Sequence, residues 1–474
     1  RDLHSFPTRR SSDLVGVAIT ANVPDSLIGR DAFQEISITG VTLPVTKHNY
    51  FVNRIDELPD ALHNAFRIAN SGRKGPVLVD ITKDVTGASM DYKPGHPMEI
   101  EDHLPEPDER EIRKIADLIN GAKRPIIYFG GGVSASEAGT ELHQLMETGD
   151  IPATYTMMAA GVIGWDDPRN MGLIGMHGTV AANKAVDKAD LLIALGTRFS
   201  DRVALNPKKF AKKATKIQVD IDRAEINKNV HVDYSVVCDA KKFLRYLLPL
   251  IEKKEHHAWI DEVTAMKKNI KDPDATGAKL HPAQVIHSVC DLTDKETIYV
   301  TDVGQHQMWA AQYLKHNNTH SFITSGGLGT MGFGYGAAIG AQIGNPRKRI
   351  IHFTGDGSFH MNMNEACTAV SEQLPIITVI LNNQVLGMVY QWQTSFYGGR
   401  YAGTTPERKT DYVKVIEGFG GKGFRAETPE GFQEVFQKAL KEKGPVWIDC
   451  RIVREERVLP MIPGGGTVDD MIIG

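Results

Sequence analysis

Short apolar runs alternate with helix-length segments along nearly the whole chain, and this alternation limits the fold more than any other feature of the sequence. The longest runs are strand-sized and end in turn or polar residues. Strands separated by helices favour parallel sheets covered on both faces, so we expect an α/β fold of doubly wound parallel sheets. The strands expected from this pattern are residues 15–20, 76–80, 125–129, 191–195, 216–219, 297–301, 349–354, 376–381 and 446–449.

Two polar stretches without apolar periodicity divide the chain into three such units. Residues 91–108 are rich in Pro, Glu, Asp and His, and residues 253–282 are charged and weakly apolar around a helix, so both are interpreted as linkers. The first unit is short and is expected to be an incomplete domain. Residues 1–14 are basic and serine-rich, and they are interpreted as non-native or unassigned. The expected domains are residues 15–90, 105–255 and 275–474, with helices at residues 57–71 and 111–120.

Composition and charge are those of an ordinary globular protein of several domains. The 474 residues are 41% hydrophobic and 24% charged, and a formal net charge of −4 gives no general attraction to nucleic acid or to an anionic membrane. No apolar run approaches the roughly 18–20 residues needed to cross a bilayer. The cysteines are far apart and lack metal-ligand spacing, which favours reduced thiols in a cytoplasmic setting. They are Cys238, Cys290, Cys367 and Cys450.

One strand-helix-strand segment predicts a specific chemistry. Residues 350–383 read IIHFTGDGSFHMNMNEACTAVSEQLPIITVILNN, so that one apolar strand ends at Asp356 between two glycines and the next ends at Asn383. Ligands bind at the carboxyl edge of a parallel sheet, where both polar ends meet. Their oxygen atoms suit Mg²⁺, which takes its remaining ligands from phosphate and water. Alone, either element would fit a plain turn or a strand cap, whereas together they predict a metal-diphosphate site.

This segment resembles the diphosphate motif of thiamine-diphosphate enzymes, which is G-D-G, an intervening helix and then N-N. The resemblance implies the fold of that enzyme family for the three sheets. It also implies that Asp356, Asn383 and the backbone carbonyl of Val385 hold Mg²⁺ on the cofactor diphosphate.

Two further stretches resemble the same family. Residues 303–308 (VGQHQM) resemble the strand-end loop that contacts the diphosphate, and residues 325–334 (SGGLGTMGFG) resemble the loop whose methionine, here Met331, wedges the cofactor into a bent conformation. A flexible apolar side chain suits that position, although by itself Met331 would be interpreted as a core residue. The residues that the resemblance assigns to thiamine diphosphate are Gly304, Gln305, His306, Gly329, Met331, Gly355, Gly357, Ser358 and Gly387.

Several segments narrow the resemblance to acetolactate synthase large catalytic subunits. Residues 386–393 (LGMVYQWQ) resemble the segment after the metal-binding asparagines, residues 458–471 (VLPMIPGGGTVDDM) the capping tail, and residues 23–35 (VPDSLIGRDAFQE) part of the pyrimidine-binding domain. The resemblance covers residues 15–474 with short interruptions. It implies that Trp392 lines the acceptor pocket and favours a larger 2-oxoacid, although alone this residue would be interpreted as plain packing. The catalytic positions implied are Gln305, Met331, Met388 and Trp392.

The middle unit contains segments that resemble the FAD-binding positions of anabolic acetolactate synthases. These segments are residues 175–179 (GMHGT), 196–202 (GTRFSDR) and 219–222 (VDID). Arg198 and Arg202 suit a pyrophosphate, and Asp220 at a strand end suits a ribose hydroxyl. Without the resemblance, these side chains would be interpreted as ordinary surface salt bridges. The positions assigned to FAD are Gly130, Gly131, Met176, His177, Gly196, Thr197, Arg198, Arg202, Asp220, Ile221 and Asp239.

The resemblance implies decarboxylation of pyruvate and condensation of the hydroxyethyl unit with pyruvate or 2-oxobutyrate, in the synthesis of valine, leucine and isoleucine. It implies thiamine diphosphate, Mg²⁺ and a structural FAD as cofactors. It also implies a homodimer or larger assembly with a regulatory small subunit, and no nucleic acid or membrane partner.

Three alternatives remain open from the sequence. One is another thiamine-diphosphate carboligase or decarboxylase, such as glyoxylate carboligase, which would keep the metal motif without the other segments. A second is a flavin- or nucleotide-binding dehydrogenase, which would need a G-x-G-x-x-G motif opening a helix directly after a strand. The third is a non-catalytic binding protein.

The family's catalytic glutamate, which protonates the aminopyrimidine from the partner subunit, belongs to a stretch upstream of Val15, and we find no equivalent. Glu35 lies after the expected position and is not assigned this role. Asn22 stands where the family keeps a glutamine just before Val23. We therefore expect that this chain, as printed, does not run the full reaction at a normal rate.

Overall fold

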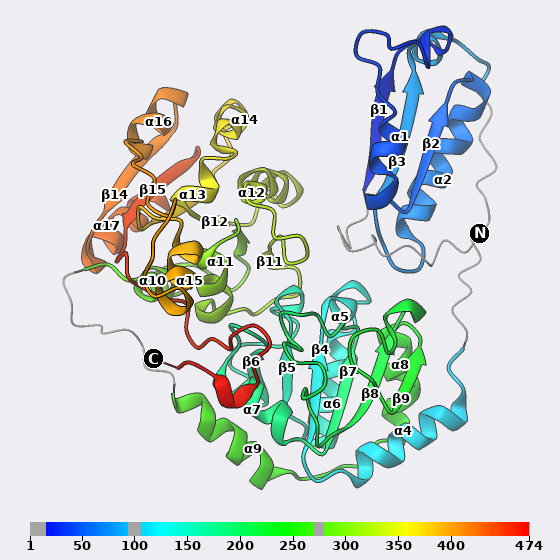
Figure 1. Cartoon of the computed structure of the whole chain (residues 1–474), viewed down its shortest axis with the longest axis vertical. Coiled ribbons are helices and arrows are strands. Elements are labelled where there is room, and N and C mark those ends of the chain that lie inside the picture. Colours follow the sequence, from blue (N-terminus) through cyan, green and yellow to red (C-terminus); the bar gives the residue numbers. More distant parts are fainter. Residues whose placement is uncertain (1–15, 93–105, 270–278, 474) are drawn as a thin grey trace. The chain divides into compact units, whose positions relative to one another are not determined.

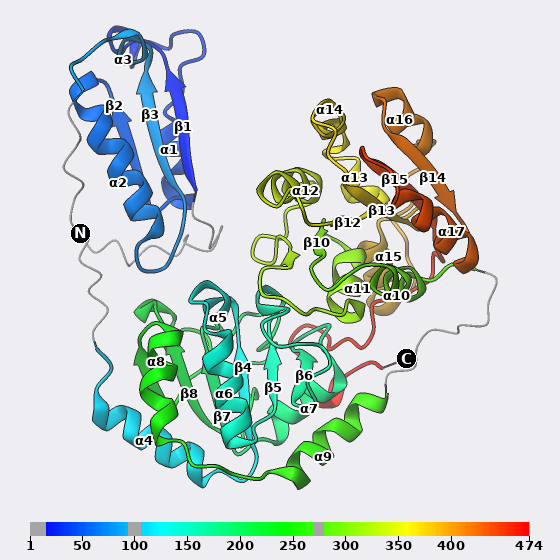
Figure 2. The same cartoon turned by 180° about the vertical axis from the view of Figure 1, so that it is seen from behind.

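The computed structural model describes residues 16–92, 106–269 and 279–473, and every strand in them belongs to one of three parallel sheets (Figures 1 and 2). The prediction of an α/β fold of parallel sheets is therefore confirmed. Residues 1–14, interpreted as non-native, lie outside the described residues. The chain divides into two compact units, of which the first holds a three-stranded sheet and the second holds two six-stranded sheets.

The first sheet has the strand order β1-β3-β2. Its elements are β1 (Val17–Asn22), α1 (Ile38–Thr42), β2 (His48–Val52), α2 (Leu58–Asn70), β3 (Val77–Thr82) and α3 (Lys83–Gly87). The small side chains of Ala61, Ala65 and Ala69 let α2 pack closely against β3, which is buried along its whole length. The edge strand β1 is less buried, and its Ile19 is 57% exposed.

The central sheet has the order β6-β5-β4-β7-β8-β9. Its elements are α4 (Glu109–Gly121), β4 (Pro125–Phe129), α5 (Gly131–Ala135), α6 (Gly139–Gly149), β5 (Ala153–Tyr155), β6 (Asn170–Leu173), α7 (Val180–Lys188), β7 (Leu191–Leu195), β8 (Thr215–Asp220), β9 (Tyr234–Val237), α8 (Ala240–Leu247) and α9 (His257–Ala265). From β4 the chain adds β5 and β6 on one side of β4, and it then crosses to add β7, β8 and β9 on the other side. This reversal of direction places a topological switch point between β4 and β7, where ligands of such sheets bind.

The third sheet has the order β11-β10-β12-β13-β15-β14. Its elements are α10 (Pro282–Leu292), β10 (Ile298–Thr301), α11 (Gln305–Tyr313), β11 (Phe322–Ile323), α12 (Phe333–Gly344), β12 (Ile350–Gly355), α13 (Asp356–Phe359), α14 (Ala366–Ser371), β13 (Ile377–Asn382), α15 (Gly387–Phe396), α16 (Tyr412–Phe419), β14 (Lys422–Ala426), α17 (Pro429–Ala439) and β15 (Val446–Arg451). Here the order reverses between β10 and β12, so the switch point lies at the ends of these two strands. Both strands and the neighbouring β13 are almost entirely buried, which agrees with their apolar sequences.

The single helix expected between the G-D-G and N-N elements is wrong. The segment instead forms the short α13, a 3-10 turn at Met363–Glu365 and the short α14. Asn362, before the 3-10 turn, has a φ of −148°, which no helix accommodates. The polar asparagines of this segment therefore interrupt the helix, and α13 is too short for a strong N-terminal dipole.

Most predicted strands of the two large sheets begin and end within two residues of the observed ones. The strand predicted at residues 15–20 is shifted, because β1 begins at Val17 and ends at Asn22. All four cysteines are free. Within the described part of the chain, no helix combines the length and the apolar character that crossing a membrane requires.

Candidate active site

The switch point of the third sheet brings together three segments that the sequence singled out separately. Residues 302–304 follow β10, residues 356–358 follow β12, and Asn383 follows β13. Because β10, β12 and β13 are parallel neighbours, all three segments lie at the same edge of the sheet. The predicted diphosphate and metal residues therefore converge, as the strand ends implied.

Asp356 is a buried carboxylate paired with a cation. Its Oδ2 lies 2.6 Å from Nη1 of Arg408, and the Tyr412 hydroxyl donates to its backbone carbonyl over 3.1 Å. Burial raises the pKa of the Asp356 carboxyl, and the charge of Arg408 opposes this shift. In this structure the charge of the buried carboxylate is compensated by Arg408, as the burial of a charge requires.

Asn383 offers the second hard oxygen. Its Nδ2 donates to Oε1 of Gln305 over 3.1 Å, and its Oδ1 accepts from the backbone N–H of Val385 over 3.3 Å. Within the described residues, no group of three or more His, Cys, Asp or Glu side chains could hold a metal ion. A magnesium site here therefore depends on one carboxylate, one amide oxygen and backbone or phosphate oxygens, a donor set that Mg²⁺ accepts.

His306 lies in a cradle made by glycines. A Cβ atom on Gly304 or on Gly355 would lie 2.9 Å or 2.8 Å from the His306 ring, so both positions exclude a larger residue. The ring is buried, and its Nε2 has no hydrogen-bond partner in the described structure. Burial lowers the pKa of His306 to about 4, with partial opposition from Asp302, so the imidazole is neutral at neutral pH. An unpaired buried nitrogen beside the strand ends fits a site for a polar ligand such as a diphosphate.

The loop that contains Met331 is fastened to the same edge. The Gly332 N–H donates to Oδ1 of Asp302 over 2.8 Å and to Oγ of Ser358 over 3.2 Å. Gly329 and Gly332 have φ values of +65° and +88°, which favour glycine. Met331 itself is 38% exposed, so it is not the core residue that its type alone would suggest.

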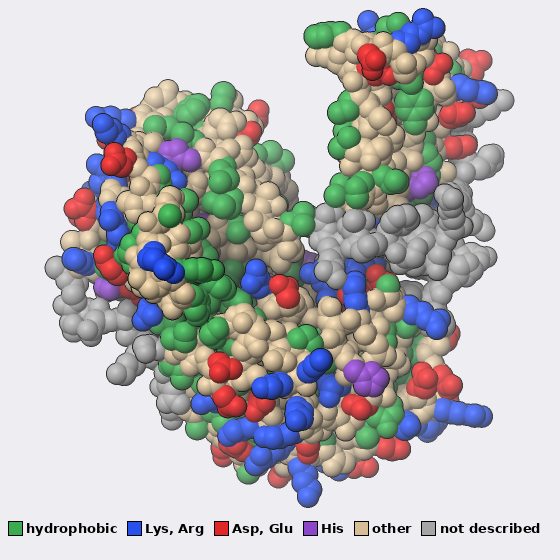
Figure 3. Space-filling model, viewed as in Figure 1, with side chains coloured by type: hydrophobic (Ala, Val, Ile, Leu, Met, Phe, Trp, Pro, Cys, Tyr) green, Lys and Arg blue, Asp and Glu red, His purple; other side chains and the backbone are tan. Residues whose placement is uncertain are grey.

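Helix α15 carries Met388 and Trp392, two of the positions that the resemblance implies to be catalytic. Met388 packs against the main core, and Trp392 is half-buried with its ring 5.0 Å from that of Phe396. Figure 3 shows apolar side chains gathered on this face of the third-sheet domain, over the position of α15 in Figure 1. Val389 and Phe396 are among the exposed apolar residues of this helix. The helix therefore presents an apolar wall beside the strand-end site.

The glycines predicted to contact FAD, and the neighbouring Gly132, have a packing role at the switch point of the central sheet. A Cβ on Gly130 would lie 2.6 Å from the Gly196 carbonyl oxygen, and a Cβ on Gly132 would lie 2.6 Å from the Gly196 Cα. A Cβ on Gly131 would lie 3.2 Å from Cβ of Met158. The loops after β4 and β7 thus touch backbone to backbone, and only glycine permits this approach.

The charged positions assigned to FAD lie around the same edge. Arg202 is 69% exposed at its side chain and lies 3.9 Å from Asp201, and its backbone carbonyl accepts from the Met176 N–H over 2.8 Å. Burial, followed by the charge of Arg202, lowers the pKa of His177 to about 4. The exposed guanidinium is available to an anion, since its salt bridge with Asp201 is long.

The remaining FAD positions differ in their surroundings. Thr197 is buried beside Gly196, and the half-buried Arg198 follows it and accepts at its backbone carbonyl from Asn229 over 3.1 Å. Asp220 is buried at the end of β8, followed by Ile221. Asp239 caps α8, because its side chain accepts from the Lys242 N–H over 3.0 Å.

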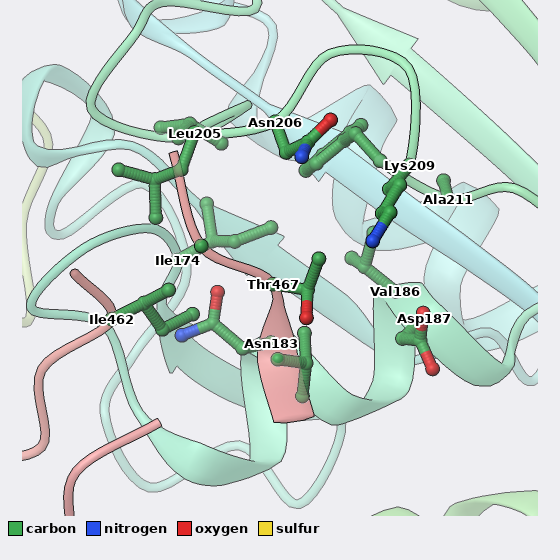
Figure 4. A pocket seen from close by; sticks show the side chains of 14 residues that line it. Ile174, Asn183, Val186, Asp187, Leu205, Asn206, Lys209, Ala211, Ile462 and Thr467 are labelled. Atoms are coloured by element: carbon green, nitrogen blue, oxygen red, sulfur yellow. The ribbon is translucent and has the colours of Figure 1, made fainter. Parts of the chain in front are cut away.

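The C-terminal segment joins the central domain to the third-sheet domain. The Ile462 N–H donates to the Met176 carbonyl over 2.8 Å, and Nδ2 of Asn206 donates to the Gly465 carbonyl over 3.2 Å. Figure 4 shows Ile462 and Thr467 of this segment facing residues of α7 and of the 203–211 loop across a small cavity. The predicted capping tail is therefore docked on the domain that carries the flavin positions.

The sequence did not single out four buried or half-buried side chains of the strand-end site. Asp302 directly follows a strand, as Asp356 does, and this position was a usable signal. The others come from helices or loops whose sequence carries no such signal. The four are Asp302, Gln391, Arg408 and Tyr412.

Comparison with known proteins assigns both large domains to one class. Residues 112–247 match the model of the thiamine pyrophosphate enzyme central domain, and residues 302–450 match that of the C-terminal TPP binding domain. These two domains, each built on a six-stranded parallel sheet, thus define a thiamine pyrophosphate enzyme.

Curated relatives narrow this class. A probable acetolactate synthase large subunit of Methanocaldococcus jannaschii is 40% identical, covering 96% of this chain and 80% of that protein. Acetolactate synthase isozyme 1 large subunit of Escherichia coli is also 40% identical, covering 96% and 81%. Chloroplastic acetolactate synthase 1 of Zea mays is 41% identical, covering 96% and 74%. The chain belongs to the acetolactate synthase large-subunit family. This membership favours acetolactate synthase over the alternative of a glyoxylate carboligase.

Proposed function

We propose that the protein is a catalytic subunit that decarboxylates pyruvate and condenses the hydroxyethyl unit with pyruvate or 2-oxobutyrate, in branched-chain amino acid synthesis. The observation that carries this proposal is the convergence of Asp356, Asn383, Gln305 and His306 at one sheet edge, in a chain of this family. Thiamine diphosphate, when bound, supplies the electron sink for the loss of CO₂.

The residues of the third-sheet domain hold and orient this cofactor. Asp356, Asn383 and the Val385 carbonyl would hold Mg²⁺, since their oxygen atoms suit this ion. The neutral His306 offers its unpaired Nε2 near the diphosphate position. The glycines at 355 and 357 leave room for phosphate oxygens close to the backbone.

The acceptor side is proposed to be apolar. Met331 would support the cofactor from its partly exposed position, while Met388 and Trp392 on α15 would line the pocket of the second 2-oxoacid. An apolar wall discriminates one methylene by about 1–3 kcal/mol. Replacing Trp392 with Leu is therefore expected to reduce the preference for 2-oxobutyrate over pyruvate by about tenfold or more, measured by competition between the two acceptors.

FAD is proposed as a structural cofactor of the central domain, because the reaction transfers no net electrons. Arg198 and Arg202 would bind its pyrophosphate, and Asp220 a ribose hydroxyl. We propose domains at residues 15–90, 105–255 and 275–474. We also propose a homodimer or larger assembly, a regulatory small subunit, in line with the large-subunit names of two relatives, and a cytoplasmic location.

Calorimetric titration with thiamine diphosphate in the presence and absence of Mg²⁺ tests the cofactor site. We expect binding that requires Mg²⁺ and is lost in Asp356→Ala. The matched control is Asp291→Ala, at an exposed carboxylate paired with Lys315, which should bind as the unaltered chain does. Equal binding by Asp356→Ala would contradict the proposed site. Incubation with labelled pyruvate, with glyoxylate as competing substrate, then distinguishes acetolactate formation from another carboligation.

A further inference from the structure

Two glutamines of α15 make the same kind of bridge to distant backbone. Gln391 accepts from the Val458 N–H over 2.8 Å and donates to the Val458 carbonyl over 3.2 Å. Gln393 accepts from the Ala402 N–H over 3.0 Å and donates to the Ala402 carbonyl over 3.2 Å. Each amide therefore fastens one residue of another segment to the helix through two hydrogen bonds.

The two bridges differ in their burial and in the further hydrogen bonds of the glutamine. Gln391 is 1% exposed, and its Oε1 also accepts from Nε2 of Gln305 over 3.0 Å. Gln305 in turn accepts from Nδ2 of Asn383 over 3.1 Å. A continuous buried chain of hydrogen bonds thus runs from Asn383 through Gln305 and Gln391 to Val458, whereas the bridge of Gln393 is exposed and ends at its loop.

The amides of this hydrogen-bonded chain are paired in one orientation. Oε1 of Gln305 accepts from Asn383, while its Nε2 donates to Gln391 and, over 3.2 Å, to the Glu456 carbonyl. Turning the Gln305 amide over would put donors against donors at Asn383. Because unpaired buried polar groups are costly, each amide fixes the orientation of the next.

We propose that Gln391 is a positioning residue that couples docking of the C-terminal segment 458–472 to the orientation of Gln305 and Asn383. The segment is also held on the central domain, where Ile462 donates to Met176. When the segment is docked, Val458 holds Gln391, and Gln391 presents its Oε1 to Gln305. The Asn383 amide then keeps its oxygen available for the metal. This inference rests on the proposed function for the identity of the ligand.

The first test compares Gln391→Met with the matched variant Gln393→Met. In each variant methionine keeps about the length of the side chain and removes both hydrogen bonds of that glutamine's bridge. Calorimetry at saturating Mg²⁺ should give thiamine diphosphate affinity about tenfold or more weaker in Gln391→Met, and within about twofold of the unaltered chain in Gln393→Met. Equal affinities in the two variants would overturn the proposal. Absence of binding by the unaltered chain would instead count against the proposed function.

A reciprocal test measures the release of the segment itself, first in the unaltered chain and then in the two variants. Arg457 is exposed next to the buried Val458, so trypsin can release residues 458–474, and mass spectrometry gives the rate of release. Coupling is reciprocal, so thiamine diphosphate with Mg²⁺ should slow the release in the unaltered chain and in Gln393→Met but not in Gln391→Met. Protein already cut by trypsin and freed of the segment should bind the cofactor more weakly. Unchanged affinity after removal of the segment would refute the coupling.

Discussion

Glycines near the carboxyl edges of the two six-stranded sheets have different roles. In the central sheet, Gly132 meets Gly196 backbone to backbone, so its lack of a side chain serves the packing of two loops. In the third sheet, Gly387 lies against the amide of Gln305, and Gly355 against the ring of His306, so glycine makes room for polar side chains. Glycines after the strands therefore serve the stability of the fold in the central domain, and they make room for the ligand site in the third-sheet domain.

The largest effect is expected from Gly132→Ala. Its Cβ would lie 2.6 Å from the Gly196 Cα, and two backbones cannot separate without opening the loops. We expect the free energy of unfolding to fall by about 3 kcal/mol, with loss of FAD binding, measured by urea unfolding and flavin titration. The control is Gly121→Ala at the end of α4, where no atom lies within 4 Å and stability should change by less than about 1 kcal/mol. Similar losses in both variants would show that the close approach to Gly196 is not what makes Gly132 sensitive to substitution.

Gly387→Ala should affect the ligand site of the third-sheet domain. Its Cβ would collide with Oε1 of Gln305 and lie 2.8 Å from Nδ2 of Asn383. Because side chains can move where backbone cannot, stability should fall less than in Gly132→Ala. Displacement of both amides should weaken thiamine diphosphate binding by about 100-fold, or about 3 kcal/mol, while FAD affinity stays unchanged. Equal loss of both cofactors would argue that the two sites are not separate.

Buried histidines are expected to make both domains acid-sensitive. Burial lowers the pKa of His177 in the central domain and of His316 in the third-sheet domain to about 4. The unfolded chain binds protons below about pH 6.5 and the folded chain only near pH 4, so stability is fully present above pH 6.5 and is lost as the pH falls towards 4.

Each histidine should therefore cost about 2 kcal/mol of unfolding free energy between pH 7 and pH 5. His177→Gln and His316→Gln should each reduce this loss by that amount, measured by urea unfolding at the two pH values. A pH dependence that neither substitution alters would show that these histidines are not its source.

The smallest effect on the fold is expected from Arg202→Ala. The side chain is 69% exposed, so the unfolding free energy should change by less than about 0.5 kcal/mol. FAD affinity should fall about tenfold, because a charge-assisted hydrogen bond to the pyrophosphate is lost. Arg113→Ala, at a similarly exposed arginine on α4, should change neither quantity. Unaltered flavin affinity in Arg202→Ala would remove this residue from the proposed site.

The sequence predicted seven of the twelve strands of the two large sheets and the convergence of Asp356 and Asn383. It did not predict the short strands β5, β6, β9, β11 and β14. It missed the break in the helix after Asp356, since helical propensity did not reveal that Asn362 leaves the helical conformation. It also gave Gly130 a ligand role only, because the contact with the carbonyl of Gly196 depends on how the two loops pack. Arg408 was missed because its ion pair with Asp356 spans 52 positions of the chain.

The parallel sheets and the polar residues at their carboxyl edges follow from the sequence, because apolar runs between helices can be buried in few other ways. Which of these polar side chains meet depends on how the elements pack. Gln305 and Gln391 are 86 positions apart, and Gln391 and Val458 are 67 apart. Their contacts depend on how α11, α15 and the C-terminal segment pack together. Hydrogen bonds are short and directional, so such partners follow from packed geometry and not from the order of residues along the chain.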